Sequence, residues 1–157
     1  MVSQSDLILQ RCDWKRNGLR VVFASGSFDL LHPGHIRLLE QARSLGDALV
    51  VAVKSDAIVR AEHGKMRPIA RAGERAEILS ALAAVDYVVV LDGATASEVI
   101  AGLAPEIIVK AGGPGSIERA FDDDEALTSA GTQVVRIPIE PGYSTDGLIQ
   151  RIRQLPA

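Results

Sequence analysis

Two histidines flank a Pro-Gly pair where a short apolar run gives way to an amphipathic pattern. The segment from Ser25 to His35 reads SGSFDLLHPGH, with His32 and His35 on either side of Pro33 and Gly34. Proline is favoured in the first turn of a helix, so the pattern predicts a helix that begins here. A helix N-terminus presents unpaired N–H groups and partial positive charge, and two imidazoles add directional donors. These residues therefore predict a phosphate site.

Zinc is the alternative ligand for a pair of histidines. Zinc sites in proteins take three or four ligands from cysteine, histidine and carboxylate side chains. The sequence has one cysteine, Cys12, and no third histidine at ligand spacing from His32 and His35. The acidic run from Asp122 to Glu125 is typical of a solvated turn at a helix start, where the helix dipole favours carboxylates. Phosphate is therefore the favoured ligand, and the spacing of residues predicts no metal site.

Short apolar runs alternate with amphipathic helical patterns along the chain. This alternation predicts βαβ units, and runs that are short and rich in β-branched residues suit strands buried on both faces. Five runs have these properties: Val21 to Ala24, Ala48 to Val53, Tyr87 to Leu91, Ile107 to Val109, and Val134 to Ile137. The expected fold class is α/β, a Rossmann-like, doubly wound, five-stranded parallel sheet flanked by helices. In such a sheet, ligands bind beyond the carboxyl ends of the strands, where the strand order reverses.

Helices are expected between and around these runs. The expected positions are Ser3 to Lys15, from near Ile36 to Leu45, after Glu74, Ser97 to Leu103, about Ile117 to Ala130, and Thr145 to Leu155. Residues 1–18 would therefore carry a leading helix packed on the outside of the fold. Residues 60–73 are charged, contain turn-forming residues and lack apolar periodicity. We expect a mobile loop there, since long loops inside compact domains often cover sites.

Composition limits the kinds of partner that the chain can have. A chain of 157 residues suffices for one domain, so residues 1–157 are expected to form a single domain. The 17 Lys and Arg residues against 20 Asp and Glu residues exclude a broad cationic surface for nucleic acid or an anionic membrane. The first 18 residues lack the apolar segment of a signal peptide or anchor. We therefore expect a cytoplasmic location, without nucleic-acid or membrane partners.

The segment from Gly26 to His35 resembles the nucleotide-binding signature of the cytidylyltransferase-like superfamily, whose His-x-Gly-His motif matches His32 to His35. Other segments resemble, in chain order, the adenylyltransferases of that superfamily that act on D-glycero-β-D-manno-heptose 1-phosphate. They are Leu38 to Asp47 (LLEQARSLGD), Val51 to Asp56 (VAVKSD), Arg67 to Ile69 (RPI), Arg75 to Tyr87 (RAEILSALAAVDY) and Pro141 to Thr145 (PGYST). The family domain is often fused to a sugar kinase, and this chain resembles the stand-alone version. The resemblance implies transfer of AMP from ATP to a sugar phosphate, with release of pyrophosphate.

The resemblance also implies roles for the matched side chains. His32 and His35 would hold the triphosphate and stabilise charge while an acceptor phosphate oxygen attacks the α-phosphorus. Arg75 would act with them by clamping a phosphate, unless it is an ordinary exposed helix arginine. Lys65 would close over the phosphates or be a solvated lysine, and Asp29 would contact the ligand, fix the turn or orient a histidine ring.

The full set of site residues implied by the resemblance has two parts. The nucleotide would contact Gly26, Ser27, Phe28, Asp29, His32, His35, Lys65, Ser144 and Thr145, and the acceptor would contact Asp56, Arg75, Lys110 and Gly112. Mg²⁺ bridging the triphosphate oxygens is implied by the reaction class and the charge of the ligand. The partners implied are therefore a nucleoside triphosphate and a sugar phosphate, and a homo-oligomer is expected from the related transferases.

Some positions near the expected cleft depart from the family pattern. Lys54 stands where asparagine is common, and Asp146 stands where a further threonine is usual. The segment from Lys110 to Gly115 reads KAGGPG where the family typically has Lys-Gly-Gly-Asp, so that Gly113 replaces an acid. Two alternatives stay open: a related transferase such as a glycerol 3-phosphate cytidylyltransferase, and a nucleotide-binding sensor domain without catalysis. The absence of an Arg-Thr-Glu-Gly segment favours adenylyl transfer over cytidylyl transfer.

Overall fold

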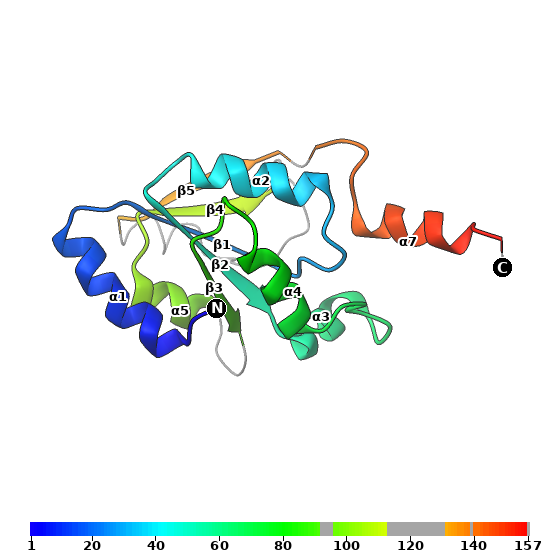
Figure 1. Cartoon of the computed structure of the whole chain (residues 1–157), viewed down its shortest axis with the longest axis horizontal. Helices are drawn as coiled ribbons and strands as arrows, with labels where there is room; N and C mark the ends of the chain where they lie inside the picture. The colour runs from blue at the N-terminus through cyan, green and yellow to red at the C-terminus, as the bar shows by residue number, and fades with distance from the viewer. Residues whose placement is uncertain (92–95, 113–130, 139, 157) are drawn as a thin grey trace.

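A five-stranded parallel sheet forms the centre of the molecule (Figure 1). The computed structural model describes residues 1–91, 96–112, 131–138 and 140–156. The strands are β1 (Val21–Gly26), β2 (Ala48–Lys54), β3 (Tyr87–Leu91), β4 (Ile107–Ala111) and β5 (Gln133–Ile137). Their order is β3-β2-β1-β4-β5, and each neighbouring pair is parallel. The order reverses between β1 and β4, so the predicted doubly wound sheet is confirmed.

Helices cover both faces of this sheet. They are α1 (Gln4–Arg16), α2 (Pro33–Arg43), α3 (Asp56–His63), α4 (Ala72–Ser80), α5 (Ala96–Leu103) and α7 (Thr145–Arg153). In Figure 1, α1 and α5 lie side by side, α2 runs along the opposite side of the sheet, and α7 extends away from the body. Five of these helices agree with the expected ones. The helix expected at about Ile117 to Ala130 falls outside the described residues.

Alternate residues of the strands feed two hydrophobic cores. One core lies between the sheet and helices α2 and α4, and the other lies between the sheet and helices α1 and α5. The first contains Val22, Val51, Leu39 and Leu79, and the second contains Phe23, Val50, Trp14 and Leu103, all buried. Each such side chain contributes about 1.5–3 kcal/mol when it is removed from water. Burial on both faces explains why the strands read as continuous apolar runs.

The predicted loop at residues 60–73 is wrong in its extent. Helix α3 continues to His63 and α4 begins at Ala72, so only residues 64–71 connect them. Ser55 caps the start of α3, and Gly64 ends it with a φ of 92°, a backbone angle that residues with a Cβ rarely adopt. The sequence concealed this helix because Arg60, Glu62 and His63 make its second half largely polar and Val59 is its buried residue.

No helix in the described ranges is both long enough and apolar enough to cross a bilayer.

Gly46 and Gly73 form a matched pair for testing the packing. A Cβ on Gly46 would lie 2.7 Å from both the Arg20 carbonyl oxygen and Cγ2 of Val22, whereas a Cβ on Gly73 would meet nothing within 4 Å. We expect Gly46→Ala to lower the free energy of unfolding by ~1–3 kcal/mol, because backbone must move. Gly73→Ala, in the first turn of α4, should raise it by up to ~1 kcal/mol. Urea unfolding measures both, and equal stabilities for the two variants would contradict the packing.

Candidate active site

The carboxyl end of β1 opens onto a cavity between the β1–α2 segment, the end of α3 and the start of α7. Most of the residues expected to contact a nucleotide lie around it. They are Gly26, Ser27, Phe28, His32, His35, Ser144 and Thr145. Segments more than a hundred residues apart in the sequence thus meet at one edge of the sheet, next to the point where the strand order reverses. The cavity lies where a doubly wound sheet binds its ligands.

His32 and His35 form a stacked pair at the start of α2. His32 is the N-cap residue and His35 follows three positions later, so both side chains project from the first turn. Their ring centroids are 3.8 Å apart and the planes differ by 19°. The backbone N–H of His32 donates to Nδ1 of His35 at 3.4 Å, which leaves the proton of a neutral His35 ring on Nε2. The ring of His35 therefore offers a donor that its own backbone contact has oriented.

Burial keeps both rings uncharged near neutral pH. Burial lowers the pKa of His32, and burial together with the neighbouring charge of His32 lowers the pKa of His35 to about 4. Uncharged imidazole rings can stack at this distance, whereas two imidazolium rings would repel each other. Nδ1 of His32 is buried and has no hydrogen-bond partner within the described residues. The pair thus supplies polar groups rather than fixed positive charge.

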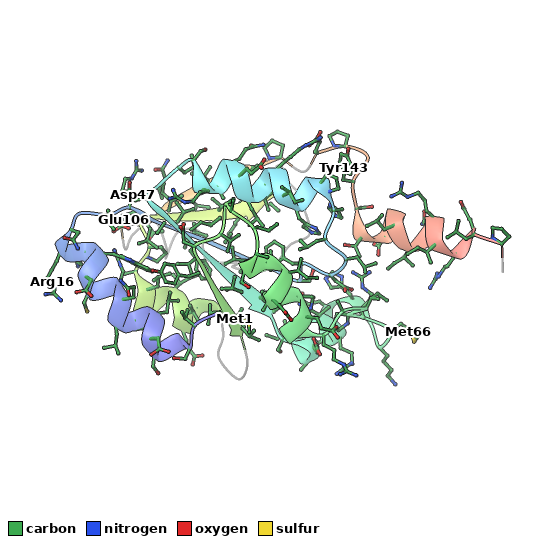
Figure 2. The ribbon with its side chains drawn as sticks, viewed as in Figure 1. Met1, Arg16, Asp47, Met66, Glu106 and Tyr143 are labelled. Carbon is green, nitrogen blue, oxygen red and sulfur yellow. The ribbon has the colours of Figure 1, made fainter. Side chains whose placement is uncertain are left out.

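Tyr143 closes over the histidine pair from the segment that leads into α7. Its ring is nearly parallel to that of His32, with centroids 6.3 Å apart, and Figure 2 shows it between α2 and α7. A Cβ on Gly34 would lie 3.0 Å from Cβ of Tyr143 and 3.1 Å from Nδ1 of His32, so this close approach requires glycine. Cζ of Arg37 lies 5.3 Å from the centroid of the Tyr143 ring, and the Arg37 guanidinium pairs with Glu140.

Asp29 is fully buried and binds the 64–71 connection. Its carboxylate accepts hydrogen bonds from Nε of Arg67 at 2.7 Å and from the backbone N–H groups of Ile69 and Ala70 at 2.9–3.0 Å. Burial raises the pKa of Asp29, but the bonds from Ala70, Ile69 and Arg67 outweigh it and hold the pKa below 3.8. Asp29 does not line the cavity, and its contacts agree with turn fixation, whereas direct ligand contact stays a prediction.

Arg75 lies beneath the cavity instead of in it. The side chain is 1% exposed, and its three nitrogens donate to Asp56 at 2.7 Å, to the Ala70 carbonyl at 2.9 Å and to the Ser27 carbonyl. Asp56 also accepts from the Ala72 N–H at 2.8 Å. Arg75 is therefore not an exposed helix arginine, and its role as a phosphate clamp stays a prediction. Asp56 belongs to the same pair, which holds the turn after β1, and its contact with the acceptor stays a prediction.

The remaining predicted residues lie in different places. Lys65 is exposed and does not line the cavity. Lys110 is half-buried on β4, and the next residue, Ala111, reaches the cavity wall. Gly112 is buried and its N–H donates to the Ile137 carbonyl at 2.8 Å, which extends the β4–β5 pairing. Gly113 falls outside the described residues.

The start of α7 forms one wall of the cavity. Ser144 caps the helix by accepting from the Gly147 N–H at 3.0 Å, and Thr145 donates its hydroxyl proton to the Asp29 carbonyl at 2.7 Å. Asp146 binds Arg67 at 3.0 Å and is 85% exposed. A second helix N-terminus therefore faces the space in front of the histidine pair, and both helix dipoles favour an anion there.

Sequence reasoning missed several polar residues of the cavity wall, among them Arg67 and His63. Arg67 and His63 both line it, the first paired with Asp29 and Asp146 and the second at the last position of α3. The matched segment Arg67 to Ile69 was a signal for the arginine. His63 gave no such signal, because it fell within the supposed loop.

The described residues do not fit a metal ion held by the protein alone. No group of three or more His, Cys, Asp or Glu side chains within the described ranges could hold one. Asp29, the carboxylate closest in sequence to the histidine motif, has both oxygens bound to donors of the protein. A cation in this cavity would therefore need oxygen ligands from the bound substrate.

Comparisons with known proteins point to one family. A family model described as cytidylyltransferase-like matches residues 23–146. The bifunctional protein HldE of Koribacter versatilis (strain Ellin345) is 45% identical over 151 residues, which are 96% of this chain and 31% of that protein. HldE of Rhodopseudomonas palustris (strain HaA2) is 40% identical over 152 residues, 97% of this chain and 31% of that protein. The chain thus spans about a third of the length of these curated relatives.

A solved structure is similar over nearly its whole length. It is the crystal structure of the lipopolysaccharide core biosynthesis protein from Thermoplasma volcanium GSS1, with a TM-score of 0.64 and 30% sequence identity. The match covers 78% of this chain and 98% of that chain.

The lowered pKa of His35 should make stability fall at acid pH. An ordinary histidine has a pKa of 6.5, whereas that of His35 is about 4, so the unfolded chain takes up a proton first as the pH falls. The free energy of unfolding should therefore decrease between pH 6.5 and 4, by at most ~3 kcal/mol from this group. His35→Asn should lack that part of the decrease. Urea unfolding of both proteins from pH 7.5 to 5 measures it, and parallel pH dependences would contradict the buried neutral ring.

Proposed function

The chain belongs to the cytidylyltransferase-like family, and on that basis we propose that it transfers AMP from ATP to a sugar phosphate, releasing pyrophosphate. The acceptor that we propose is D-glycero-β-D-manno-heptose 1-phosphate. Support comes from the matched segments, from relatives named bifunctional protein HldE, and from a solved relative named for lipopolysaccharide core biosynthesis. The observation that carries the proposal is the stacked pair of His32 and His35 at the start of α2, facing the start of α7 across one cavity.

The reaction needs positioned donors and no nucleophilic side chain. A phosphate oxygen of the acceptor attacks the α-phosphorus of ATP, a new P–O bond forms, and the bond from the α-phosphorus to the bridging oxygen of pyrophosphate breaks. Negative charge develops on the transferring and leaving oxygens in the transition state. The first turns of α2 and α7 both present N–H groups and partial positive charge to this space. The leaving pyrophosphate carries its charge away as an anion, so no proton transfer is required.

The histidine pair would act through preorganised hydrogen bonds. His35 carries its proton on Nε2 when neutral, since Nδ1 accepts from the His32 backbone. His32 is the N-cap residue, and its ring is stacked on that of His35 and nearly parallel to that of Tyr143. Rings fixed in this way need little reorganisation when the oxyanion forms, and such donors are worth more in the transition state than in the ground state.

We further propose that Mg²⁺ enters as part of the triphosphate substrate. When bound, the ion would neutralise part of the charge of the triphosphate. The side chains that the structure describes around the cavity do not neutralise this charge, because burial keeps His32 and His35 neutral and Arg67 is already paired with two carboxylates. Since ATP and sugar phosphates are intracellular substrates, we propose a cytoplasmic location. A homo-oligomer is also proposed, by likeness to related transferases.

A donor and acceptor panel tests the reaction. We expect pyrophosphate release that depends on added D-glycero-β-D-manno-heptose 1-phosphate, with a higher kcat/KM for ATP than for CTP. The acceptors should include glycerol 3-phosphate, and coupled pyrophosphate assays at saturating Mg²⁺ give the rates. A higher kcat/KM with CTP would identify a cytidylyltransferase. Saturable nucleotide binding without turnover on any acceptor would identify a non-catalytic sensor.

Substitution of either histidine should lower kcat more than it weakens ATP binding. His32→Asn retains a side chain that can cap a helix, and His35→Asn retains a small polar group, so both variants should fold. Loss of one preorganised donor to a developing oxyanion typically costs ~10²–10³ in kcat. Gln41→Ala, at an exposed position of α2, is the matched control and should keep wild-type rates. Wild-type kcat at saturating substrates in either asparagine variant would exclude that histidine from catalysis.

A further inference from the structure

A buried lysine lies at the carboxyl end of β2, next to the cavity edge of the sheet. Lys54 is the last residue of the strand and its side chain is 11% exposed. Its Nζ donates to both carboxylate oxygens of Glu62 at 2.8 Å. Burying an ammonium group costs several kcal/mol unless a partner compensates it, and here a two-pronged contact does so. A lysine in place of the more common asparagine therefore has a defined effect: it fixes the Glu62 carboxylate.

The fixed carboxylate stands beside a histidine of the cavity wall. Oε2 of Glu62 lies 3.7 Å from Nε2 of His63, the last residue of α3 and a lining residue of the cavity. The side chain of His63 is 47% exposed, and its Nδ1 has no hydrogen-bond partner within the described residues. This distance is too long for a hydrogen bond, so the contact is an ion pair when the ring is protonated, and it engages Nε2 and leaves Nδ1. Lys54, Glu62 and His63 thus form one chain of contacts that ends at the cavity.

The arginine of this cavity wall is already paired. Arg67 is held by Asp29 and Asp146, with 12% of its side chain exposed. His32 and His35 lie across the cavity on α2 and are neutral by burial. In Figure 1, α2 runs along the upper side of the sheet, and α3 lies at the lower right beside the end of β2. His63 thus reaches the cavity from the end of α3, whereas the histidine pair reaches it from the start of α2, and His63 has a ring nitrogen left for a ligand.

We propose that His63 is a phosphate-binding residue of this cavity, and that Lys54 and Glu62 are positioning residues that hold its ring. The inference rests on the proposed function for the identity of the ligand, since both substrates of that reaction carry phosphate. With Nε2 beside the Glu62 carboxylate, the doubly protonated ring has Nδ1–H left to donate to a phosphate oxygen, either of the triphosphate or of the acceptor. The role is assigned by contacts of this chain's own residues at positions 54, 62 and 63.

Steady-state kinetics of His63→Asn tests the contact. We expect KM to rise about 10-fold or more for one substrate, with kcat changed less than about 3-fold, because a hydrogen bond to a charged group is lost from binding. A rise in KM for ATP identifies the triphosphate as the partner, and a rise for the sugar phosphate identifies the acceptor. Unchanged KM for both substrates overturns the proposal. His63 is half exposed, so the variant should fold, and His63→Gln provides a second test at the same position.

A double-mutant cycle tests the positioning pair. Glu62→Gln and Lys54→Met should each raise the same KM several-fold, whereas Lys54→Arg, which can keep a two-pronged contact, should stay near wild type. In the His63→Asn background, Glu62→Gln and Lys54→Met should cause no further rise. Arg60→Ala, an exposed residue of α3, is the control for changes to that helix. Equal effects with and without the His63 ring would show a merely structural pair and overturn the positioning role.

Calorimetry separates this inference from the proposed function. Binding of Mg·ATP and of inorganic phosphate requires no turnover and can be compared between wild type and His63→Asn. If wild type binds either probe about 10-fold more tightly but turns over no acceptor, the proposed function fails and the inference stands. If wild type turns over and neither KM nor affinity depends on His63, the inference alone fails.

Discussion

The buried carboxylate of Asp29 is the contact on which the rest of the site depends. Its oxygens bind Arg67 and the N–H groups of Ile69 and Ala70, and its own carbonyl accepts the Thr145 hydroxyl. An ionised carboxylate out of water costs several kcal/mol unless donors surround it, so these segments are held where they are by the need to satisfy it. Asp29, a single residue of the segment after β1, thereby joins the α3–α4 connection and the start of α7 to the sheet.

A second buried pair supports the same turn from below. Arg75 binds Asp56 and the Ser27 carbonyl, which connects α4, the start of α3 and the segment after β1. Arg75 and Asp56 do not line the cavity, so they act on the reaction only through the segment after β1 that they hold in place. Phe28 and Leu30, on either side of Asp29, have φ values of 47° and 51°, which are unfavourable for such residues. The two buried ion pairs are what can hold this strained turn open toward α2.

The sheet and the histidine pair could be predicted from the sequence, because both depend on local patterns. Apolar runs such as Ala48 to Val53 report burial on both faces, and a Pro-Gly step between histidines reports a helix start. The role of Arg75 could not be predicted, since burial of an arginine depends on a partner nineteen residues away. Helix α3 was missed because its second half is largely polar and exposed, which hides the period of its buried side. With it went His63, whose placement follows from the end of that helix.

Helix α7 has no buried residue, although its first turn is part of the cavity wall. Its attachment to the body is concentrated at that turn, through the Thr145 hydroxyl and the Asp146 carboxylate. The rest of the helix extends outward in Figure 1. Local opening of such an element has a low free energy that is set by the few contacts at its base. Amide hydrogens along α7 should therefore exchange with solvent on a timescale governed by the occupancy of a cavity that most of them never touch.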